Sequence, residues 1–354
     1  MPQHIVADAR LISSSGIGRY LRAVLEAIGG TAVRLTLLTQ VRPNPRDPWF
    51  SNSRHRTFPL PVYHPFEQIG IPLVVPCCDV FFTPHFSTTS LPLRASRRVV
   101  TVHDVFHLSE EARFGRVLLA YAKFLYRSAL ATADEVIIAS QFTRSELIRH
   151  FPGYAGKLRI ISNSINTCLF YHDEERPKVD GPYALFVGNL KPHKNLGAGV
   201  HALDCCGDPG LRLVVAGASS GFITGMGGEL LKYQNDARVV FVGIPDDREL
   251  RRLYSHAECL VFPSLYEGFG YPALEAMACG CPVICSDIPA LRETCGNAAL
   301  FCDPRSPETF AEAILRVRSD SVLRQKLLSN GTERVARYPL ERFRQETLQV
   351  LMGG

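Results

Sequence analysis

Two glutamates, Glu267 and Glu275, are the residues of this sequence whose type and spacing point most directly to chemistry. An apolar run ending near Phe262 predicts a strand, and the glycines within 268–270 permit positive φ and a close approach of backbone to a ligand. The next residues, a proline and the run 273–278, favour a helix. Both carboxylates can therefore reach one ligand at the helix start, accepting hydroxyls of a sugar or ribose while helix amides hold an anion. Taken singly, each glutamate is better explained as an ordinary loop or helix residue, and only the joint pattern is specific.

A second candidate segment combines a glycine with cations. Gly188 ends an apolar run, and Asn189, Lys191 and Lys194 follow within six residues. A glycine at a strand end followed by lysines suits a phosphate site, where lysine acts as a point charge. The alternative is that these lysines belong to a solvated loop.

Two further segments carry candidate residues in the first half of the chain. Gly16 lies in a Gly-x-Gly between the first strand and the first helix, which alone is weak evidence, and an ordinary serine/glycine turn is the alternative. His103 ends an apolar run, so we expect it at the carboxyl edge of a sheet, where Asp104 can orient the imidazole. A lone histidine is more often structural.

The elements that must position these residues form an α/β pattern. Continuous apolar runs predict buried parallel strands, and they alternate with helical patterns. The length of 354 residues favours two domains. We predict a first Rossmann-like domain over 1–170, a linker over 171–182, a second Rossmann-like domain over 183–336, and a C-terminal helix over 337–354 returning to the first domain. Such domains bind phosphorylated ligands at the carboxyl ends of their strands, in a cleft between them.

With these motifs in place, the sequence resembles the retaining glycosyltransferases of bacterial family 4, the glycosyl transferases group 1. Their hallmark is a glutamate, seven residues and a second glutamate, which Glu267 and Glu275 match, and segments 280–286 and 289–293 fit the same pattern. The resemblance covers nearly the whole chain and is strongest over 183–304. It implies the glycosyltransferase B fold, in which two Rossmann-like, doubly wound domains face a cleft.

The resemblance also implies roles for the glutamate motif. Glu267 would contact the transferred sugar, and Glu275 would bind the nucleotide ribose. The amides of Gly268, Phe269 and Gly270 would hold sugar hydroxyls.

At other positions the sequence agrees with the family pattern only in part. Lys194 matches the phosphate-binding lysine, but Asn189 stands where arginine is frequent, so Lys191 is expected to compensate. Gly16 matches a loop that reaches the donor phosphate, and His103 matches a histidine near the donor sugar. On the acceptor side, two weaker candidates are His85 and His107.

The mechanism implied by the resemblance needs no strong protein nucleophile, because the leaving diphosphate can accept the proton of the acceptor hydroxyl. We expect no cofactor and no metal, since the chain contains no Asp-x-Asp, and Asp246 is expected to cap a helix. The early Gly-Ile-Gly-Arg-Tyr and the segment 188–196 resemble those of polysaccharide-assembly mannosyltransferases. GDP-mannose is therefore the favoured donor, with UDP-glucose or another UDP-sugar as the alternative, and a glycan or lipid-linked acceptor is expected.

The charge distribution leaves other partners open. Residues 1–165 carry 19 Lys/Arg and 11 Asp/Glu, a net charge of +8, against 20 and 23 in the remainder. A basic half can attract phosphates, nucleic acid or an anionic membrane, or it is simply a solvated surface. The basic, aromatic segment 113–127 can lie on such a membrane or form a buried helix. The start of the chain lacks a signal-peptide pattern and no spanning segment appears, so a cytoplasmic, membrane-peripheral protein is expected.

Two rival functions follow from the same features. A nucleotide-sugar epimerase shares the two-domain architecture and needs no acceptor. A nucleic-acid-binding protein would use the basic half and bind with steep salt dependence. We expect no nucleic-acid partner, because no recognised nucleic-acid motif occurs and the second half is slightly acidic.

Two compositional features complete the sequence-based expectations. The 11 cysteines are scattered, and the spacing of Cys279, Cys281 and Cys285 does not match structural zinc sites, so we expect packing rather than metal binding. Segment 41–66 is rich in proline and contains the only tryptophan, Trp49, which predicts a loop, either functional or a surface excursion.

Overall fold

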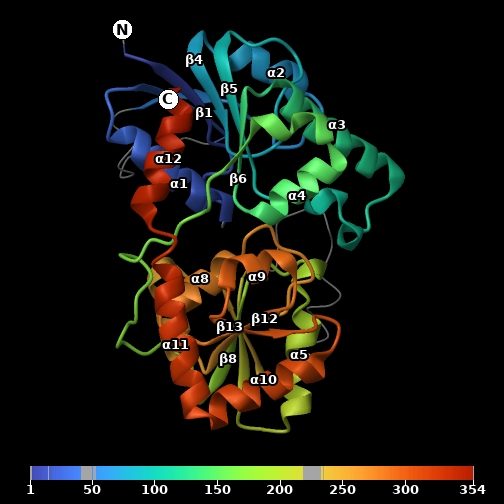
Figure 1. The fold of residues 1–354 in the computed structure, drawn as a ribbon, viewed down its shortest axis with the longest axis vertical. Coiled ribbons are helices and arrows are strands. Elements are labelled where there is room, and N and C mark those ends of the chain that lie inside the picture. Colours follow the sequence, from blue (N-terminus) through green and yellow to red (C-terminus); the bar gives the residue numbers. More distant parts are fainter. Residues whose placement is uncertain are drawn as a thin grey trace. The chain divides into compact units, whose positions relative to one another are not determined.

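The computed structural model describes residues 2–14, 16–40, 50, 53–217, 233 and 235–353. The chain forms two compact units, which are treated separately (Figure 1). Unit 1 comprises Met1–Asn163 with Leu340–Gly354, and unit 2 comprises Ser164–Pro339. None of the helices in the described ranges is both long and apolar enough to cross a lipid bilayer.

Unit 1 contains a parallel sheet with the strand order β3-β2-β1-β4-β5-β6-β7 among the described residues. Its strands are β1 His4–Asp8, β2 Arg34–Thr39, β3 Ser53–Thr57, β4 Cys78–Thr83, β5 Ala95–Val102, β6 Glu135–Ile138 and β7 Leu158–Ile160. Its α-helices are α1 Gly16–Gly29, α2 Glu67–Val74, α3 Arg116–Thr132, α4 Gln141–His150 and α12 Leu340–Met352. The strand order reverses between β1 and β4, which is where open α/β sheets bind ligands.

Unit 2 repeats this arrangement with the order β10-β9-β8-β11-β12-β13. Its strands are β8 Tyr183–Val187, β9 Arg212–Ala216, β10 Val239–Gly243, β11 Cys259–Phe262, β12 Val283–Ser286 and β13 Ala299–Cys302. Its α-helices in the described residues are α5 Leu196–Cys206, α7 Asp247–His256, α8 Tyr271–Ala278, α9 Pro289–Cys295, α10 Pro307–Ser319 and α11 Ser321–Val335. Here the order reverses between β8 and β11. The expected cap of α7 is confirmed, because the Asp246 side chain accepts a hydrogen bond from Glu249 N–H at 2.8 Å.

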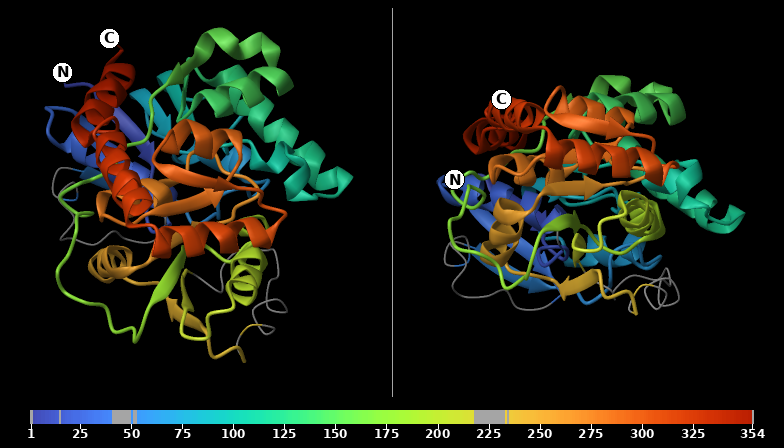
Figure 2. Two further views of the ribbon diagram at one scale, coloured as in Figure 1. Left: turned by 60° about the horizontal axis from the view of Figure 1, so that its bottom comes forward. Right: turned by 90° about the horizontal axis from the view of Figure 1, so that it is seen from below.

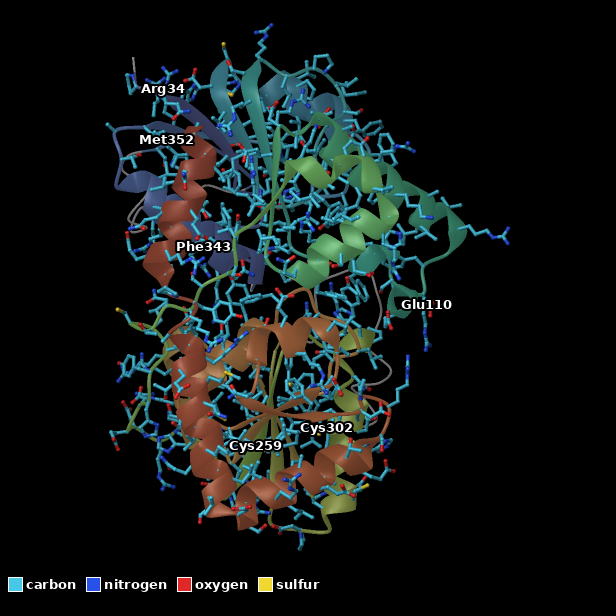
Figure 3. All side chains as sticks on the ribbon, viewed as in Figure 1. Arg34, Glu110, Cys259, Cys302, Phe343 and Met352 are labelled. Carbon is cyan, nitrogen blue, oxygen red and sulfur yellow. The ribbon has the colours of Figure 1, made fainter. Side chains whose placement is uncertain are left out.

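The core of unit 1 follows from apolar strands and helical stripes. All residues of β1 are buried, as expected for a central parallel strand. The buried stripe of α1 packs on this sheet and also meets α12, which lies beside α1 (Figure 1). Phe343 of α12, labelled in Figure 3, meets the ring of Tyr20 at a centroid distance of 5.4 Å. The last helix therefore belongs to unit 1.

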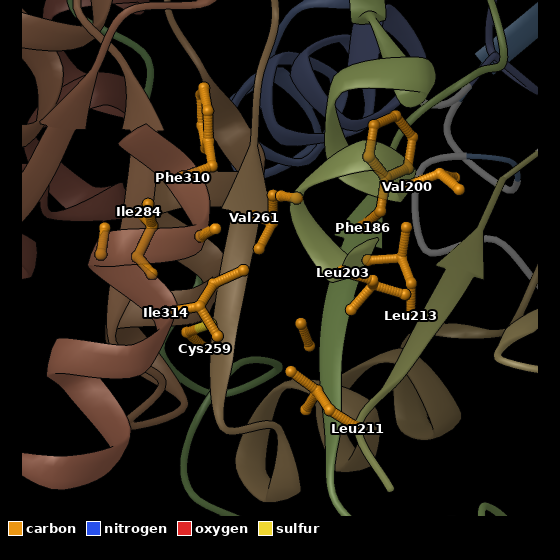
Figure 4. Packing of buried hydrophobic residues seen from close by; sticks show 14 of the residues in the cluster. Phe186, Val200, Leu203, Leu211, Leu213, Cys259, Val261, Ile284, Phe310 and Ile314 are labelled. Atoms are coloured by element: carbon orange, nitrogen blue, oxygen red, sulfur yellow. The ribbon is translucent and has the colours of Figure 1, made fainter. Parts of the chain in front are cut away.

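The core of unit 2 lies between its sheet and two helices. Helices α5 and α10 pack against each other, and Figure 2 shows them side by side. Figure 4 shows the side chains that fill this layer: Phe186, Val200, Leu203, Leu211, Leu213, Cys259, Val261, Ile284, Phe310 and Ile314. The close packing of these apolar side chains stabilises the sheet of unit 2. The sheet in turn positions the loops that follow its strands at its carboxyl edge.

The structure corrects two boundaries expected from the sequence. Segment 41–66 is not a continuous loop, because β3 pairs in parallel with β2, although Trp49 lies outside the described residues. The polar sequence of this edge strand, Ser-Arg-His-Arg-Thr, hides it from apolar-run analysis. Segment 171–182 does not join the units, since the chain passes between them at 163–164 and Asp173 binds Arg251 of unit 2 at 2.7 Å.

Most cysteines of unit 2 are buried packing residues. Cys279, Cys281 and Cys285 are buried free thiols, and Cys259 and Cys302, labelled in Figure 3, belong to the core. Burial raises the pKa of the Cys281 thiol well above its ordinary value, which keeps it protonated. Within the described ranges, His, Cys, Asp and Glu side chains form no group of three or more placed to hold a metal ion.

Candidate active site

The turn after β8 positions Lys194. This 3₁₀ turn, Pro192–Lys194, ends at Asn195, which adopts a left-handed conformation with φ 57°. The Asn195 amide donates hydrogen bonds to Pro263 O at 3.1 Å and to Pro304 O at 2.7 Å. The residue next to Lys194 is therefore fixed by two other loops of unit 2.

The loop after β11 places Glu267 against this lysine. Leu265 N–H donates to His193 O at 2.7 Å, which ties the two loops together. Lys194 Nζ then lies 2.5 Å from Glu267 Oε1, and their side chains are only 16% and 10% exposed. Strands β8 and β11 are neighbours at the reversal of strand order, so the ion pair lies where such sheets bind ligands.

Helix α8 begins four residues after Glu267, and its N-terminus is fixed by tertiary contacts. Gly270 caps this helix with φ 101°, and a Cβ at this position would come within 2.5 Å of Leu291 Cδ2. Phe269 is buried, and its carbonyl accepts a hydrogen bond from Thr294 Oγ1 at 2.6 Å. Glycine is therefore required at 270, and the positive end of the α8 dipole is fixed beside the loop that carries Glu267.

Glu275 lies in the second turn of α8 and is 2% exposed. Its Oε2 accepts a hydrogen bond from the buried hydroxyl of Tyr254 on α7 at 3.0 Å. One carboxylate oxygen is thus held by a neutral donor, which fixes the side chain. Tyr254 was not recognised from the sequence as a site residue, because it lies 21 residues from Glu275 on another helix. The available signal was that a buried tyrosine hydroxyl requires a hydrogen-bond partner.

Two buried polar atoms lie near these loops without a partner in the described part of the chain. They are Asn189 Oδ1, after β8, and Ser264 Oγ, after β11. Buried polar groups in proteins are nearly always hydrogen-bonded, so these atoms are candidates for ligand contacts. Lys191 caps the 3₁₀ turn, and its N–H donates to Asn189 O at 2.8 Å. Ser264 was not recognised from the sequence as a site residue, although it lies only three residues before Glu267.

Gly16 opens helix α1 in unit 1. A Cβ at this position would meet no heavy atom within 4 Å, so the backbone here is open. Gly18 differs, because its Cβ would come within 2.5 Å of Ile12 O. The tight loop therefore requires Gly18, whereas Gly16 leaves room beside the helix start.

His103 follows β5 and is oriented by a backbone carbonyl. Its Nε2 lies 2.9 Å from Pro84 O, so Nε2 carries the proton that is donated. Its ring packs edge-on to Tyr20 at a centroid distance of 4.8 Å, and burial lowers its pKa to about 4. The expectation that Asp104 orients the imidazole is wrong: Asp104 Oδ1 instead accepts from Phe106 N–H at 2.9 Å.

The two weaker histidine candidates have different surroundings. His85 is 1% exposed; Ser87 N–H donates to its Nδ1 at 3.2 Å, and its Nε2 lies 3.2 Å from Asp8 Oδ2. His107 lies among aromatic rings, 5.2 Å from the ring of Phe86. His85 is therefore enclosed within the protein, whereas His107 is half-buried.

A buried ionic cluster at the end of β1 went unrecognised in the sequence. Arg10 Nη2 lies 2.5 Å from both Asp8 Oδ2 and Glu67 Oε1, with all three side chains at most 1% exposed. The guanidinium stacks on Phe58 and donates to Leu60 O at 3.0 Å. Arg10 also holds the pKa of Asp8 below its ordinary value, against the effect of burial. The cluster fixes α2 and the segment before it to the end of β1.

Comparison with known proteins gives several relatives that are named as mannosyltransferases. O-antigen chain mannosyltransferase B of Escherichia coli is 27% identical over 281 residues, which cover 76% of this chain and 73% of that protein. O-antigen chain mannosyltransferase RfbU of Salmonella typhimurium is 28% identical over 256 residues, covering 72% and 69%. The structure of HepE from Anabaena in complex with UDP-glucose aligns over 99% of this chain and 100% of that one, with a TM-score of 0.81 and 18% identity. This last likeness supports the fold alone.

Family models account for most of the sequence. Residues 14–168 match the model described as Glycosyltransferase Family 4, and residues 170–334 match the model described as Glycosyl transferases group 1. The two parallel α/β sheets agree with the glycosyltransferase B fold of the structural neighbours. The chain therefore belongs to the family 4 glycosyltransferases, the glycosyl transferases group 1.

Proposed function

We propose that this glycosyltransferase moves a sugar, with retention of anomeric configuration, from a nucleotide sugar to a hydroxyl of a glycan or lipid-linked acceptor in polysaccharide assembly. The observation that carries the proposal is the meeting of Lys194, Glu267 and the α8 N-terminus where the strand order of unit 2 reverses. This arrangement offers a cation and helix amides to a diphosphate, and a carboxylate to sugar hydroxyls.

The donor phosphates are assigned to the cationic part of this site. Lys194 supplies a positive charge, and the α8 N-terminus supplies a fixed dipole, so both stabilise the charge that develops on the leaving diphosphate. Asn189 and Lys191 would complete the phosphate contacts in place of the arginine usual in the family. In unit 1, a phosphate contact at Gly16 and a donor-sugar contact at His103 remain proposals from the family resemblance.

The sugar and the ribose are assigned to the carboxylates. Glu267 would accept hydroxyls of the transferred sugar, together with the amides of Gly268, Phe269 and Gly270. Glu275 would bind the ribose, with its side chain positioned by the hydrogen bond from Tyr254. Replacing Glu267 by alanine should then abolish transfer, while the same change at Glu275 should chiefly weaken donor binding.

In this scheme the configuration is retained because the new glycosidic bond forms on the face of the anomeric carbon from which the diphosphate leaves. No protein nucleophile is needed. The leaving diphosphate takes the proton of the acceptor hydroxyl, and the protein contributes positioning and charge stabilisation. We propose that no metal is needed, because Lys194 and α8 supply the positive charge. NMR of the product's anomeric centre, with and without EDTA, tests both statements; inversion, or loss of activity in EDTA that magnesium restores, would contradict them.

GDP-mannose is the proposed donor. The names of the two O-antigen mannosyltransferases support mannose, while the UDP-glucose bound to HepE keeps UDP-sugars as the alternative. A thermal-shift panel of GDP, UDP, GDP-mannose and UDP-glucose separates the two. Stabilisation by none of these would overturn the proposal, and epimerised donor formed without acceptor would identify an epimerase instead.

Peripheral contact with an anionic membrane is proposed for helix α3. Its buried face packs on unit 1 through Ala122, Leu125 and Tyr126. Its other face exposes Val117 by 86%, alongside the apolar residues Leu118 and Phe124 and the cations Arg116, Lys123 and Arg127. Apolar side chains flanked by cations bind the surface of anionic bilayers. Flotation with phosphatidylglycerol vesicles should recover the protein and Val117→Glu should prevent it; equal recovery with phosphatidylcholine would contradict the electrostatic part.

A further inference from the structure

The Lys194–Glu267 pair is built to persist. Its two loops are joined by the hydrogen bond from Leu265 N–H to His193 O, and Asn195 fixes the end of the lysine turn. The charged atoms are 2.5 Å apart, and little of either side chain is exposed. Neither loop can move away without breaking backbone contacts, so any phosphate that approaches Lys194 also enters the field of a carboxylate.

That field acts differently on the substrate and the product of a sugar transfer. In a nucleotide sugar, the distal phosphate is esterified to the sugar and carries one negative charge. In the free nucleoside diphosphate this phosphate is terminal, and its second ionisation near pH 6 adds most of another charge at pH 7. In the donor, sugar hydroxyls can donate to the Glu267 carboxylate, but after transfer that carboxylate faces the added charge with no sugar between them.

We propose that Glu267 discriminates against the nucleoside diphosphate product and so promotes its release. This inference rests on the proposed function, in which Lys194 holds the distal phosphate of the donor. One added charge roughly 6 Å from the carboxylate, at an effective dielectric constant of about 20–40, corresponds to about a tenfold to hundredfold loss of product affinity. Glu267 is therefore a specificity-determining residue as well as a sugar contact.

Calorimetric titration of Glu267→Gln with GDP, UDP, GDP-mannose and UDP-glucose tests the proposal. For the base that the wild type binds, the variant should bind the nucleoside diphosphate at least about tenfold more tightly and the nucleotide sugar no more tightly. The matched control is Glu258→Gln, which removes the same charge at the opposite end of β11, where Glu258 lies 3.7 Å from Arg324. This control should leave both affinities unchanged.

The pH dependence separates electrostatic discrimination from a structural effect. The tightening caused by Glu267→Gln should grow between pH 5.5 and pH 8 for the diphosphate, because its terminal phosphate ionises in this range, and stay constant for the nucleotide sugar. If the single variant does not fold, Lys194→Met provides a second background: adding Glu267→Gln to it should again tighten diphosphate binding.

The outcomes are distinct. If the wild type binds none of the four nucleotides, the proposed function fails and this inference with it. If the wild type binds them but Glu267→Gln binds the diphosphate equally or more weakly, the proposed function stands and the discrimination by Glu267 is overturned. Equal tightening in Glu258→Gln would also overturn it, because the effect would then come from net charge alone.

Discussion

Replacing Gly270 by alanine should destabilise unit 2 by about 2–6 kcal/mol. The φ of 101° at this position strains any residue with a Cβ, which costs on the order of 1–3 kcal/mol. The new Cβ would lie 2.5 Å from Cδ2 of the fully buried Leu291, so the Leu291 side chain or the backbone must shift. Such overpacking adds about 1–3 kcal/mol. In molecules that still fold, a shifted α8 should also weaken nucleotide binding.

Urea denaturation followed by far-UV circular dichroism, together with calorimetry, measures the first effect. Gly16→Ala is the matched comparison at another helix start, because its Cβ would meet no heavy atom within 4 Å. We expect this second variant to change the free energy of unfolding by less than about 1 kcal/mol.

A double mutant separates the two contributions at Gly270. Leu291→Ala removes the steric conflict but leaves the backbone strain, so the double mutant should lose about 1–2 kcal/mol less than the sum of the two single losses. A loss below about 0.5 kcal/mol in Gly270→Ala, or strictly additive losses in the double mutant, would refute the reasoning about this helix cap.

Three other predictions follow from buried polar groups. Tyr254→Phe removes the hydroxyl bound to Glu275, so we expect weaker nucleotide binding and a stability loss of about 1–2 kcal/mol, measured by titration and urea denaturation; unchanged affinity would mean that this bond does not position Glu275. Arg10→Met removes the cation that pairs with the buried carboxylates of Asp8 and Glu67, so the free energy of unfolding should fall by about 3–5 kcal/mol in the same denaturation assay. A near-neutral effect would contradict the stabilising role of this ionic cluster. His103 has its pKa lowered to about 4 in the folded protein, so the unfolded chain binds a proton first as pH falls. Its share of stability should therefore be complete above about pH 6.5 and decline by up to about 3 kcal/mol towards pH 4, and His103→Gln should remove that slope.

The sequence by itself determined the α/β class, most of the strands and the family. Buried parallel strands such as β1 and β8 read as continuous apolar runs, because both faces of the sheet are covered by helices. The motif from Glu267 to Glu275 is local, since a loop, a glycine cap and a helix follow one another along the chain. Polar edge strands such as β3 were missed, because half-exposed residues leave no apolar run.

The tertiary structure alone decided which of these residues meet. Lys194 and Glu267 are 73 residues apart, and they form an ion pair because β8 and β11 are neighbours in the sheet. The contact between Glu275 and Tyr254 likewise depends on the packing of α7 beside α8. Local spacing encodes which side chains share one element, but contacts between distant segments depend on the strand order and the packing that hold those elements together.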